Sequence, residues 1–408
     1  MTTRSSATPS VSTQRSILLL SFATFSSMAS QRVCDAMLPE LSRVFAVGLS
    51  ESARVVSVFA IVYGALQLVF GPLGDRLGKF RVIAWATLAC SAGNVLAVFA
   101  GSLEMLVVSR VLVAIGAAAI IPLGLAWVGD VTDPAHLQET IARVGLGTTL
   151  GVSSGQLVGG LLTDTLGWRW AFGLLALLFC GVGMLLLADL GRQQRAAQLA
   201  NAHAEAAPAR AGFVVQLVSI LSMPWARTVL LVGIVEGAAG FGVLAIWASH
   251  LHHTLGFSLS AAGAIVALFG AGGVLYMAVA RHLIRRLRPT RLVVVGGGLI
   301  CVASLVIGCA SAPYRMLTVP ASLVAGFGFF TFHNVMQANA AQMKPGARGS
   351  AVSLFAASLF LGQSAGVLVA ASLSERLGAG PVVVLAGVTL GALGLWFSRA
   401  LRVHGASA

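Results

Sequence analysis

The chain has 408 residues, of which 57% are hydrophobic and 10% are charged, and its mean hydropathy is +0.91. A water-soluble protein of this length needs far more surface charge, so the composition excludes that class. The 47 glycines and long apolar runs indicate closely packed membrane helices, and the alternating strand pattern of an outer-membrane barrel is absent from the sequence.

Twelve apolar runs are each long enough, at about 20 residues, to cross a bilayer as a helix. They lie at about 17–38, 52–70, 82–102, 105–128, 144–163, 170–190, 228–249, 259–280, 292–311, 316–339, 350–373 and 381–398. The first run continues through Arg32 and Asp35 to Pro39 without a clear small-residue cleavage site, so we expect it to be a span and not a signal peptide.

The longest polar interruption, at 191–225, falls at mid-chain. The predicted fold is therefore an all-α integral membrane protein with two pseudo-symmetric six-helix bundles, 1–190 and 226–408, joined by a cytoplasmic linker, 191–225. Within the linker, Phe213–Leu221 is a candidate for a short amphipathic helix on the membrane surface.

The 26 lysines and arginines are distributed unevenly between the two sides of these spans. If both termini are cytoplasmic, Arg32 and Arg110 lie within spans, and the outer side receives only Arg43, Arg54, Arg169, Arg315 and Arg376. This bias predicts a multi-pass protein of the bacterial inner membrane with both termini inside. The net charge of +13 then reflects orientation and contact with anionic lipid, and no nucleic-acid partner is expected.

The two halves of the sequence repeat. One set of residues recurs at a constant spacing: Gly151, Gly155, Leu162, Asp164, Leu166 and Gly167 match Gly362, Gly366, Leu373, Glu375, Leu377 and Gly378. Tyr63 and Gly64 likewise match Phe269 and Gly270. Parallel repeats of this kind are typical of transporters that bind substrate between two bundles near the bilayer midplane.

Four motifs stand at fixed places among the spans. "GPLGDRLGKFRV" (71–82) joins spans two and three, "SRVLVAIGAAA" begins one residue before Arg110 in span four, "GVSSGQLVGG" (151–160) lies in span five, and "GWRWAF" (167–172) opens span six. Together they resemble the major facilitator superfamily over the whole chain, and in particular its twelve-helix proton-coupled drug and metabolite antiporters. Val113 and Ala114 depart from the span-four motif, and Gln156 replaces the proline of the span-five antiporter motif.

The resemblance implies a gate on the cytoplasmic side. Asp75 is expected to meet the start of span eleven near Gly349, and Lys79 or Arg76 to reach Asp130, when the carrier faces outward. A loop that only sets topology is the alternative. The motif residues assigned to the gate are Gly71, Gly74, Asp75, Arg76, Gly78, Lys79 and Asp130, and those of the span-five motif are Gly151, Gly155, Gly159 and Gly160.

Ionisable residues within spans are costly and usually functional. The resemblance places Asp35 near Arg110, and such a pair can take up and release a proton as a cavity opens to alternate sides. A static ion pair that orders spans one and four is the alternative. Arg32, one turn before Asp35, is either a competing partner or an attractor for an anionic substrate.

Glu236 lies in span seven with no basic residue nearby in the sequence. It is a candidate for a second proton site or for binding a cationic substrate, with a neutral, hydrogen-bonded carboxyl as the alternative. His333 and Gln337 share one face of span ten and, with Gln156, are candidates for the substrate cavity or for contacts between helices.

The sequence favours no metal, cofactor or enzyme chemistry. The five cysteines lie in apolar runs, and His250, His252 and His253 lie near a predicted loop without acids or cysteines. No nucleophile–base arrangement or P-loop is present in the sequence. The leading prediction is a monomeric, proton-coupled antiporter that exports a small organic molecule; an uptake symporter or facilitator, and a non-transporting receptor or assembly factor, are the alternatives.

Overall fold

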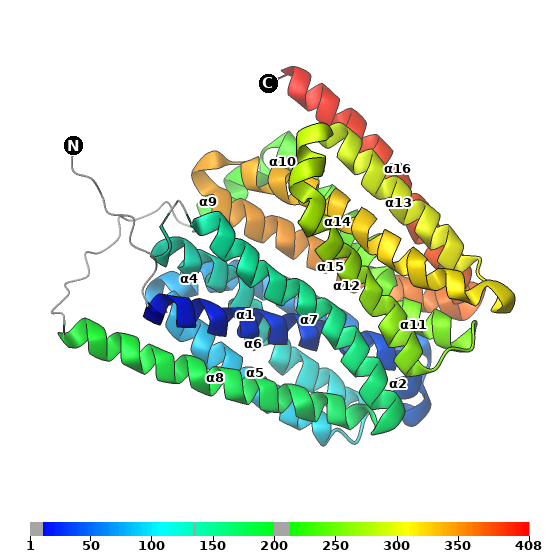
Figure 1. The fold of residues 1–408 in the computed structure, drawn as a ribbon, viewed down its shortest axis with the longest axis horizontal. Helices are drawn as coiled ribbons and strands as arrows, with labels where there is room; N and C mark the ends of the chain where they lie inside the picture. The colour runs from blue at the N-terminus through cyan, green and yellow to red at the C-terminus, as the bar shows by residue number, and fades with distance from the viewer. Residues whose placement is uncertain (1–10, 134–135, 200–212, 408) are drawn as a thin grey trace.

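The computed structural model describes residues 11–133, 136–199 and 213–407, and all regular structure in these ranges is helical. Two groups of helices lie side by side, one ending with α8 and one beginning with α10 (Figure 1). The first group contains α1 (Val11–Arg32), η1 (Asp35–Met37), α2 (Leu38–Phe45), α3 (Leu49–Ser52), α4 (Arg54–Leu77), α5 (Lys79–Val98), α6 (Leu103–Val131), α7 (Leu137–Thr165) and α8 (Trp168–Leu199).

The second group follows the short helix α9 (Phe213–Leu221). It contains α10 (Pro224–Glu236), the π-helical turn η2 (Gly237–Gly242), α11 (Val243–His253), α12 (Leu259–Arg286), α13 (Pro289–Gly308), η3 (Ala312–Leu317), α14 (Thr318–Gln342), η4 (Pro345–Ala347), α15 (Arg348–Leu377) and α16 (Ala379–Ser407). We call the helix ends where α1 begins and α16 ends the termini end, and the other side the opposite end.

Eleven segments of the described chain are long and apolar enough to cross a membrane. The twelfth predicted span is α7, a helix of 29 residues that is less apolar because glycine, serine and threonine recur along it. It packs against α1 on one side and α12 on another, where small residues allow close contact between helices. The structure therefore confirms the predicted all-helical membrane fold.

The mid-chain segment differs in part from the predicted linker. Helix α8 continues past the predicted start of the linker to Leu199, and α9 covers the residues expected to be helical. Residues 200–212 of the predicted linker lie outside the described residues. Helix α9 is held to the second group because Lys344 donates to the Ser219 hydroxyl and Ser350 donates to Gln216.

The sequence repeat corresponds to a repeated packing arrangement. A Cβ at Gly151 or Gly155 of α7 would overlap backbone carbonyl oxygens of α1, at Phe25 and Ala29. The matching glycines of α15, Gly362 and Gly366, meet the carbonyl oxygens of Ile234 and Ala238 in the same way. Each group thus packs a glycine-bearing helix closely against its own first long segment.

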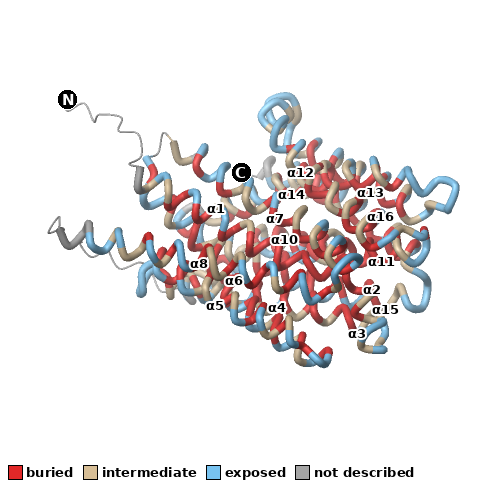
Figure 2. The backbone as a smooth tube through the Cα atoms, turned by 60° about the horizontal axis from the view of Figure 1, so that its bottom comes forward, coloured by how far each residue is buried: buried red, intermediate tan, exposed pale blue. Residues whose placement is uncertain are grey.

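The two groups also meet each other symmetrically. Gly64 of α4 lies against Phe360 of α15, and its repeat partner Gly270 of α12 lies against Ser153 of α7. Buried residues run through the middle of the helices, whereas the connecting turns are mostly exposed (Figure 2). The polar residues buried in this middle layer are therefore the ones that require a functional explanation.

Candidate functional site

The first transmembrane segment is interrupted in the middle layer. Helix α1 ends at Arg32, and the single-turn η1 begins at Asp35, whose side chain is fully buried. Asp35 Oδ2 accepts from Arg32 Nη1 at 3.3 Å and from Gln156 Nε2 at 3.4 Å, while Oδ1 has no partner. The carboxylate therefore has one oxygen held by a charge and an amide and one oxygen free to bind a proton.

Arg32 also connects the two groups of helices. Its Nη1 donates to the carbonyl oxygen of Phe241 in η2 at 3.4 Å, and its guanidinium lies 4.3 Å from the centre of the Phe241 ring. The side chain is 1% exposed. One buried cation thus bonds to an acid of the first group and to the backbone of the second.

Arg110 lies close enough to Asp35 for an electrostatic interaction, as the resemblance implies, but the direct ion pair of Asp35 is with the competing partner Arg32. Arg110 of α6 donates to the carbonyl oxygen of Ser30 at 2.6 Å and lies 4.4 Å from the centre of the Phe59 ring. Asp35 forms its ion pair with Arg32 instead. The physical reason is proximity: Arg32 lies three residues before Asp35 and reaches it within one turn, whereas the end of α1 brings a backbone carbonyl to Arg110.

The seventh transmembrane segment, Pro224–His253, is interrupted near its middle. Glu236 is the last residue of α10 and directly precedes η2. Its Oε1 lies 2.7 Å from His333 Nδ1 of α14, and its Oε2 is buried without a partner. His333 in turn stacks on Phe329, so this acid has the basic neighbour that its own sequence segment lacks.

The two interruptions lie next to each other in the repeat, since the end of α1 corresponds to η2 while η1 corresponds to the start of α11. Because Ala29 and Ala238 pack equivalently, Arg32 matches Phe241, and these two residues contact each other. Gln31, next to Arg32, donates to Gln363 Oε1 of the second group at 3.3 Å. Interrupted helices in both repeats are a feature of transporter binding sites, and π turns are common at functional sites, so this region is the candidate site.

The opposite end carries two matching links between the groups. Asp164 accepts from the backbone N–H and hydroxyl of Ser260, at 3.2 and 2.7 Å, at the start of α12. Its repeat partner Glu375 accepts from the N–H and hydroxyl of Ser50, at 2.8 and 3.0 Å, at the start of α3. Each carboxylate lies at the positive start of a helix of the other group, and the Ser260 bonds lower the pKa of Asp164.

Sequence reasoning singled out neither serine, although it did pair Asp164 with Glu375 through the repeat. The available signal was a repeated acid at the end of spans five and eleven. A carboxylate that recurs at the end of matching spans in both halves suggests a shared role, such as a bond to another segment.

The charged residues at the junction of α4 and α5 lie close together. Lys79 Nζ lies 2.5 Å from Asp130 Oδ2 of α6 and 3.7 Å from Asp75 Oδ1. Asp75 is 55% exposed, and a Cβ at Gly349, its expected contact on α15, would have no neighbouring atom within 4 Å. In this conformation the Lys79–Asp130 contact is present, and the contact expected between Asp75 and α15 is not.

The glycines of the motif at the junction of α4 and α5 and those of the span-five motif in α7 differ in role. Gly78 has a φ of +88° at the turn into α5, where other residues are strained, and a Cβ at Gly74 would overlap Leu123 of α6. Gly71 has open space around it, and Arg76 is exposed. In α7, Gly159 continues the contact with α1 at Val33, while Gly160 faces Leu259 of the other group.

The remaining candidates are divided by burial. Gln156 is fully buried, with Oε1 unpartnered beside Asp35, whereas Gln337 is exposed one turn beyond His333 towards the termini end. The five cysteines are unpaired, and the described residues contain no group of three metal-ligating side chains.

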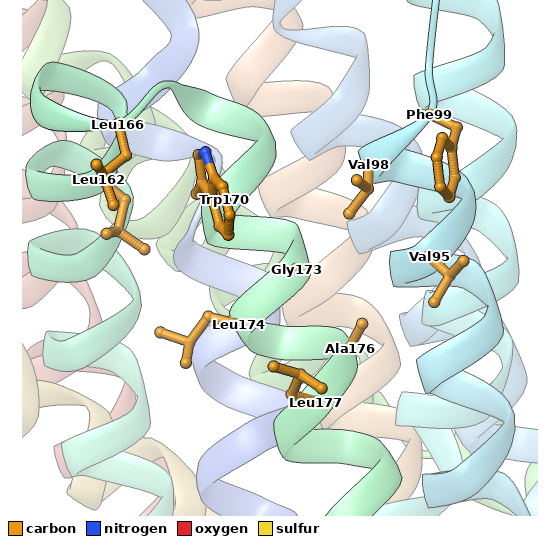
Figure 3. Close-up of a pocket in the computed structure, with 10 residues that line it drawn as sticks. All are labelled: Val95, Val98, Phe99, Leu162, Leu166, Trp170, Gly173, Leu174, Ala176 and Leu177. Carbon is orange, nitrogen blue, oxygen red and sulfur yellow. The ribbon is translucent and has the colours of Figure 1, made fainter.

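A hollow of about 460 Å³ between α5, α7 and α8 is separate from this site (Figure 3). Its lining is apolar and includes Trp170, Leu177 and Phe99, which are all more than 60% exposed on the outer face. In a membrane protein, such an exposed apolar groove faces lipid, so we do not assign the binding site to it.

Comparison with known proteins identifies the class. The sequence profile of the Major Facilitator Superfamily matches residues 20–367. The chain therefore belongs to this superfamily, in agreement with its multi-pass helical fold.

Individual relatives differ in cargo. Riboflavin transporter RibZ of Clostridioides difficile is 25% identical over 156 residues, covering 38% of this chain and 34% of RibZ. Multidrug export protein EmrB of Escherichia coli K12 is 25% identical over 179 residues, covering 44% of this chain and 35% of EmrB. The matches thus span about a third of the length of these relatives.

The fold is also that of solved transporters. The inward-facing, unoccupied structure of a bacterial homologue of the human lysosomal transporter Spinster superposes with a TM-score of 0.78 at 16% identity, over 96% of this chain and 98% of the homologue. At this identity the likeness is one of fold alone.

Proposed function

We propose that the protein is a proton-coupled exporter of small organic molecules that works as a monomer in the bacterial inner membrane, with both termini in the cytoplasm. The observation that carries the proposal is the bonding of Arg32 to both Asp35 and the Phe241 carbonyl. A titratable acid is thereby connected to the contact between two groups of helices that must move apart during transport.

In the proposed cycle, this structure is the inward-facing state. The opposite end is closed by the Asp164–Ser260 and Glu375–Ser50 links, and the middle is joined through Arg32. Separation of the groups at the opposite end breaks the Arg32–Phe241 bond and admits outside water to Asp35. Asp35 then takes up a proton outside and releases it inside, when the ion pair with Arg32 forms again.

The gate at the termini end completes the cycle. Asp75, exposed here, would reach the start of α15 in the outward-facing state, while Lys79 stays on Asp130. Asp164 and Glu375 already use this chemistry at the opposite end, since each holds the start of a helix in the other group. We therefore assign Gly71, Gly74, Asp75, Arg76, Gly78, Lys79 and Asp130 to the cytoplasmic gate.

The pair of Glu236 and His333 is the proposed second polar site. Phe329, Phe355 and Phe241 lie around it: the His333 ring centre is 5.6 Å from that of Phe329 and 6.0 Å from that of Phe355, and Phe241 packs on Phe329. An acid with one free oxygen beside aromatic faces suits an amphiphilic molecule that carries a hydrogen-bond donor or a positive charge. Gln337 lies towards the termini end on the same helix face and would line the path from the cytoplasm.

Export is supported by the span-five motif and by the relative named as an export protein. Uptake on the same fold stays the second candidate because Gln156, which replaces the antiporter proline, bonds directly to Asp35.

Everted membrane vesicles distinguish the two directions. A thermal-shift screen that includes riboflavin and amphiphilic dyes first identifies a ligand of the purified protein. Proton-driven export predicts that this ligand accumulates inside everted vesicles whose interior is acidified and that collapse of the gradient releases it. Accumulation only when the outside is acidified would show uptake instead.

A further inference from the structure

The two groups of helices differ in how their charges are paired at the termini end. In the first group, Lys79 pairs with Asp130, Arg15 with Asp189, and Arg143 with Glu139. In residues 226–408 the Asp and Glu side chains are only Glu236, in the middle layer, and Glu375, at the opposite end. The basic residues at this end of the second group therefore have no carboxylate side chain of their own group to neutralise them: Arg227, Arg281, Arg285, Arg286, Arg288, Arg291, Lys344, Arg348, Arg399 and Arg402.

A concave site lies within this basic region. A hollow of about 600 Å³ is lined by Arg288, Pro289, Thr290, Arg291, Leu401 and Arg402. Helices α13 and α16 run antiparallel in close contact, so the start of one and the end of the other form the hollow together. The first turn of α13 contains no acid, and the positive start of this helix adds to the charge of the three arginines.

The surface next to the hollow is suited to acyl chains. On α13, Val295 is 43% exposed, and on α16, Leu395 and Trp396 are 54% and 51% exposed. Trp396 precedes Arg402 by a distance of about 9 Å along the helix, at 1.5 Å per residue. A tryptophan on an outer helix, with an arginine nearer the helix end, marks the boundary between acyl chains and headgroups.

We propose that this hollow binds the phosphodiester headgroup of an anionic phospholipid, with its acyl chains lying along the exposed apolar face of α13 and α16. Guanidinium groups bind phosphate oxygens in pairs, and basic hollows between helices on the cytoplasmic side suit such headgroups. The adjoining apolar face favours a lipid over a free phosphate, because acyl chains can contact this face and a phosphate ion cannot. The site is independent of proton coupling and of the direction of transport.

Native mass spectrometry of the purified full chain tests the site directly. Phosphatidylglycerol, cardiolipin, neutral phosphatidylcholine and inorganic phosphate are titrated separately onto the wild type and onto an Arg288→Gln/Arg402→Gln variant. We expect the variant to bind the two anionic lipids about 30-fold more weakly, because each interfacial arginine contributes about fivefold. Phosphatidylcholine and inorganic phosphate should bind the wild type weakly.

The matched control removes two arginines from the same end of the outer helix α8. Arg192 and Arg195 are both exposed there, and the Arg192→Gln/Arg195→Gln variant should bind the anionic lipids within twofold of wild type. Equal losses in both double variants, no loss in either, or inorganic phosphate binding as tightly as the lipids would each overturn the proposal. If the α13/α16 double variant is unstable, Arg291→Gln alone should lower lipid affinity about fivefold, and unchanged binding would overturn it equally.

Discussion

The two ends of the molecule contain the same kind of contact in different states. At the opposite end, Asp164 and Glu375 each hold the start of a helix that belongs to the other group. At the termini end, Asp75 is 55% exposed. Its ion pair is with the neighbouring Lys79, which also bonds to Asp130. The difference suggests that one conformation uses one set of carboxylate-to-helix contacts and that the alternative conformation uses the other.

The middle layer connects these two ends. Arg32 bonds to Asp35 within one group and to Phe241 in the other, whereas Glu236 and His333 both belong to the second group. In the proposed cycle, a proton on Asp35 would therefore change a contact between the two groups, and a proton on Glu236 would change a contact within one of them.

The largest expected effect comes from removing Arg32. Arg32→Ala leaves the Asp35 carboxylate buried without its cation, which should lower the free energy of unfolding by about 3–5 kcal/mol. Thermal unfolding in detergent measures this loss. Arg43→Ala, which removes a 74% exposed partner of Glu40, should leave stability almost unchanged. Equal losses in both variants would show that Arg32 does not hold a buried charge.

The next effect concerns the close glycine packing that the two groups of helices share. Gly155→Ala places a methyl group against the carbonyl oxygen of Ala29, and Gly366→Ala does the same at Ala238 in the second group. Each change should cost about 1–3 kcal/mol through overpacking. Gly145→Ala on the same helix α7 meets open space and should be neutral or slightly stabilising. A loss on only one side of the repeat would break the symmetry between the two groups.

A smaller effect is expected from removing the two links at the opposite end. Asp164→Asn combined with Glu375→Gln weakens both contacts and should raise the ratio of outward- to inward-facing molecules about tenfold, if each exposed link contributes about 0.7 kcal/mol. Spin labels at Gly101 and Ser311, in a cysteine-free background, report the separation of the groups at this end by electron–electron resonance. An unchanged distance distribution would remove these links from the gate.

The smallest effect is on pH dependence at the opposite end. The pKa of Asp164 is lowered from its ordinary 3.8 by the Ser260 bonds, so the link is present above that value and is lost as the pH falls through the lowered pKa. Ser260→Ala should move this loss to higher pH, towards 3.8, with a small change in stability because Asp164 is exposed. Stability measured between pH 5 and 2 checks the direction, and a midpoint moved to lower pH would contradict it.

Much of the fold could be predicted from the sequence. Hydropathy and the bias of basic residues are read from one segment at a time, and the repeat is read by comparing two segments. Segment α7 was predicted as a span from its apolar run although its hydropathy is modest, and its glycines recur in α15. Helix α8 extends beyond the predicted span because polar residues at its termini end continue the helix.

The bonding partners of the site residues were less predictable. Asp35, Arg32 and Glu236 were identified because charges are rare in spans, but their partners depend on which helix faces meet. Periodicity does not indicate that Arg110 turns to the carbonyl of Ser30 or that His333 reaches Glu236 from another helix. The π turn η2, which brings the Phe241 carbonyl to Arg32, likewise has no clear sequence signal beyond its glycines.

The most direct test is proton movement driven by substrate across liposomes that contain the purified protein. With a ligand from the thermal-shift screen on one side, a pH-sensitive dye in the lumen should report counter-movement of protons for the wild type and for a Glu139→Gln control, whose carboxyl is exposed on α7. Asp35→Asn should still bind the ligand and exchange it across the membrane, but with no proton movement. Proton movement that persists at the wild-type rate in Asp35→Asn would contradict the assignment of Asp35 as the coupling site.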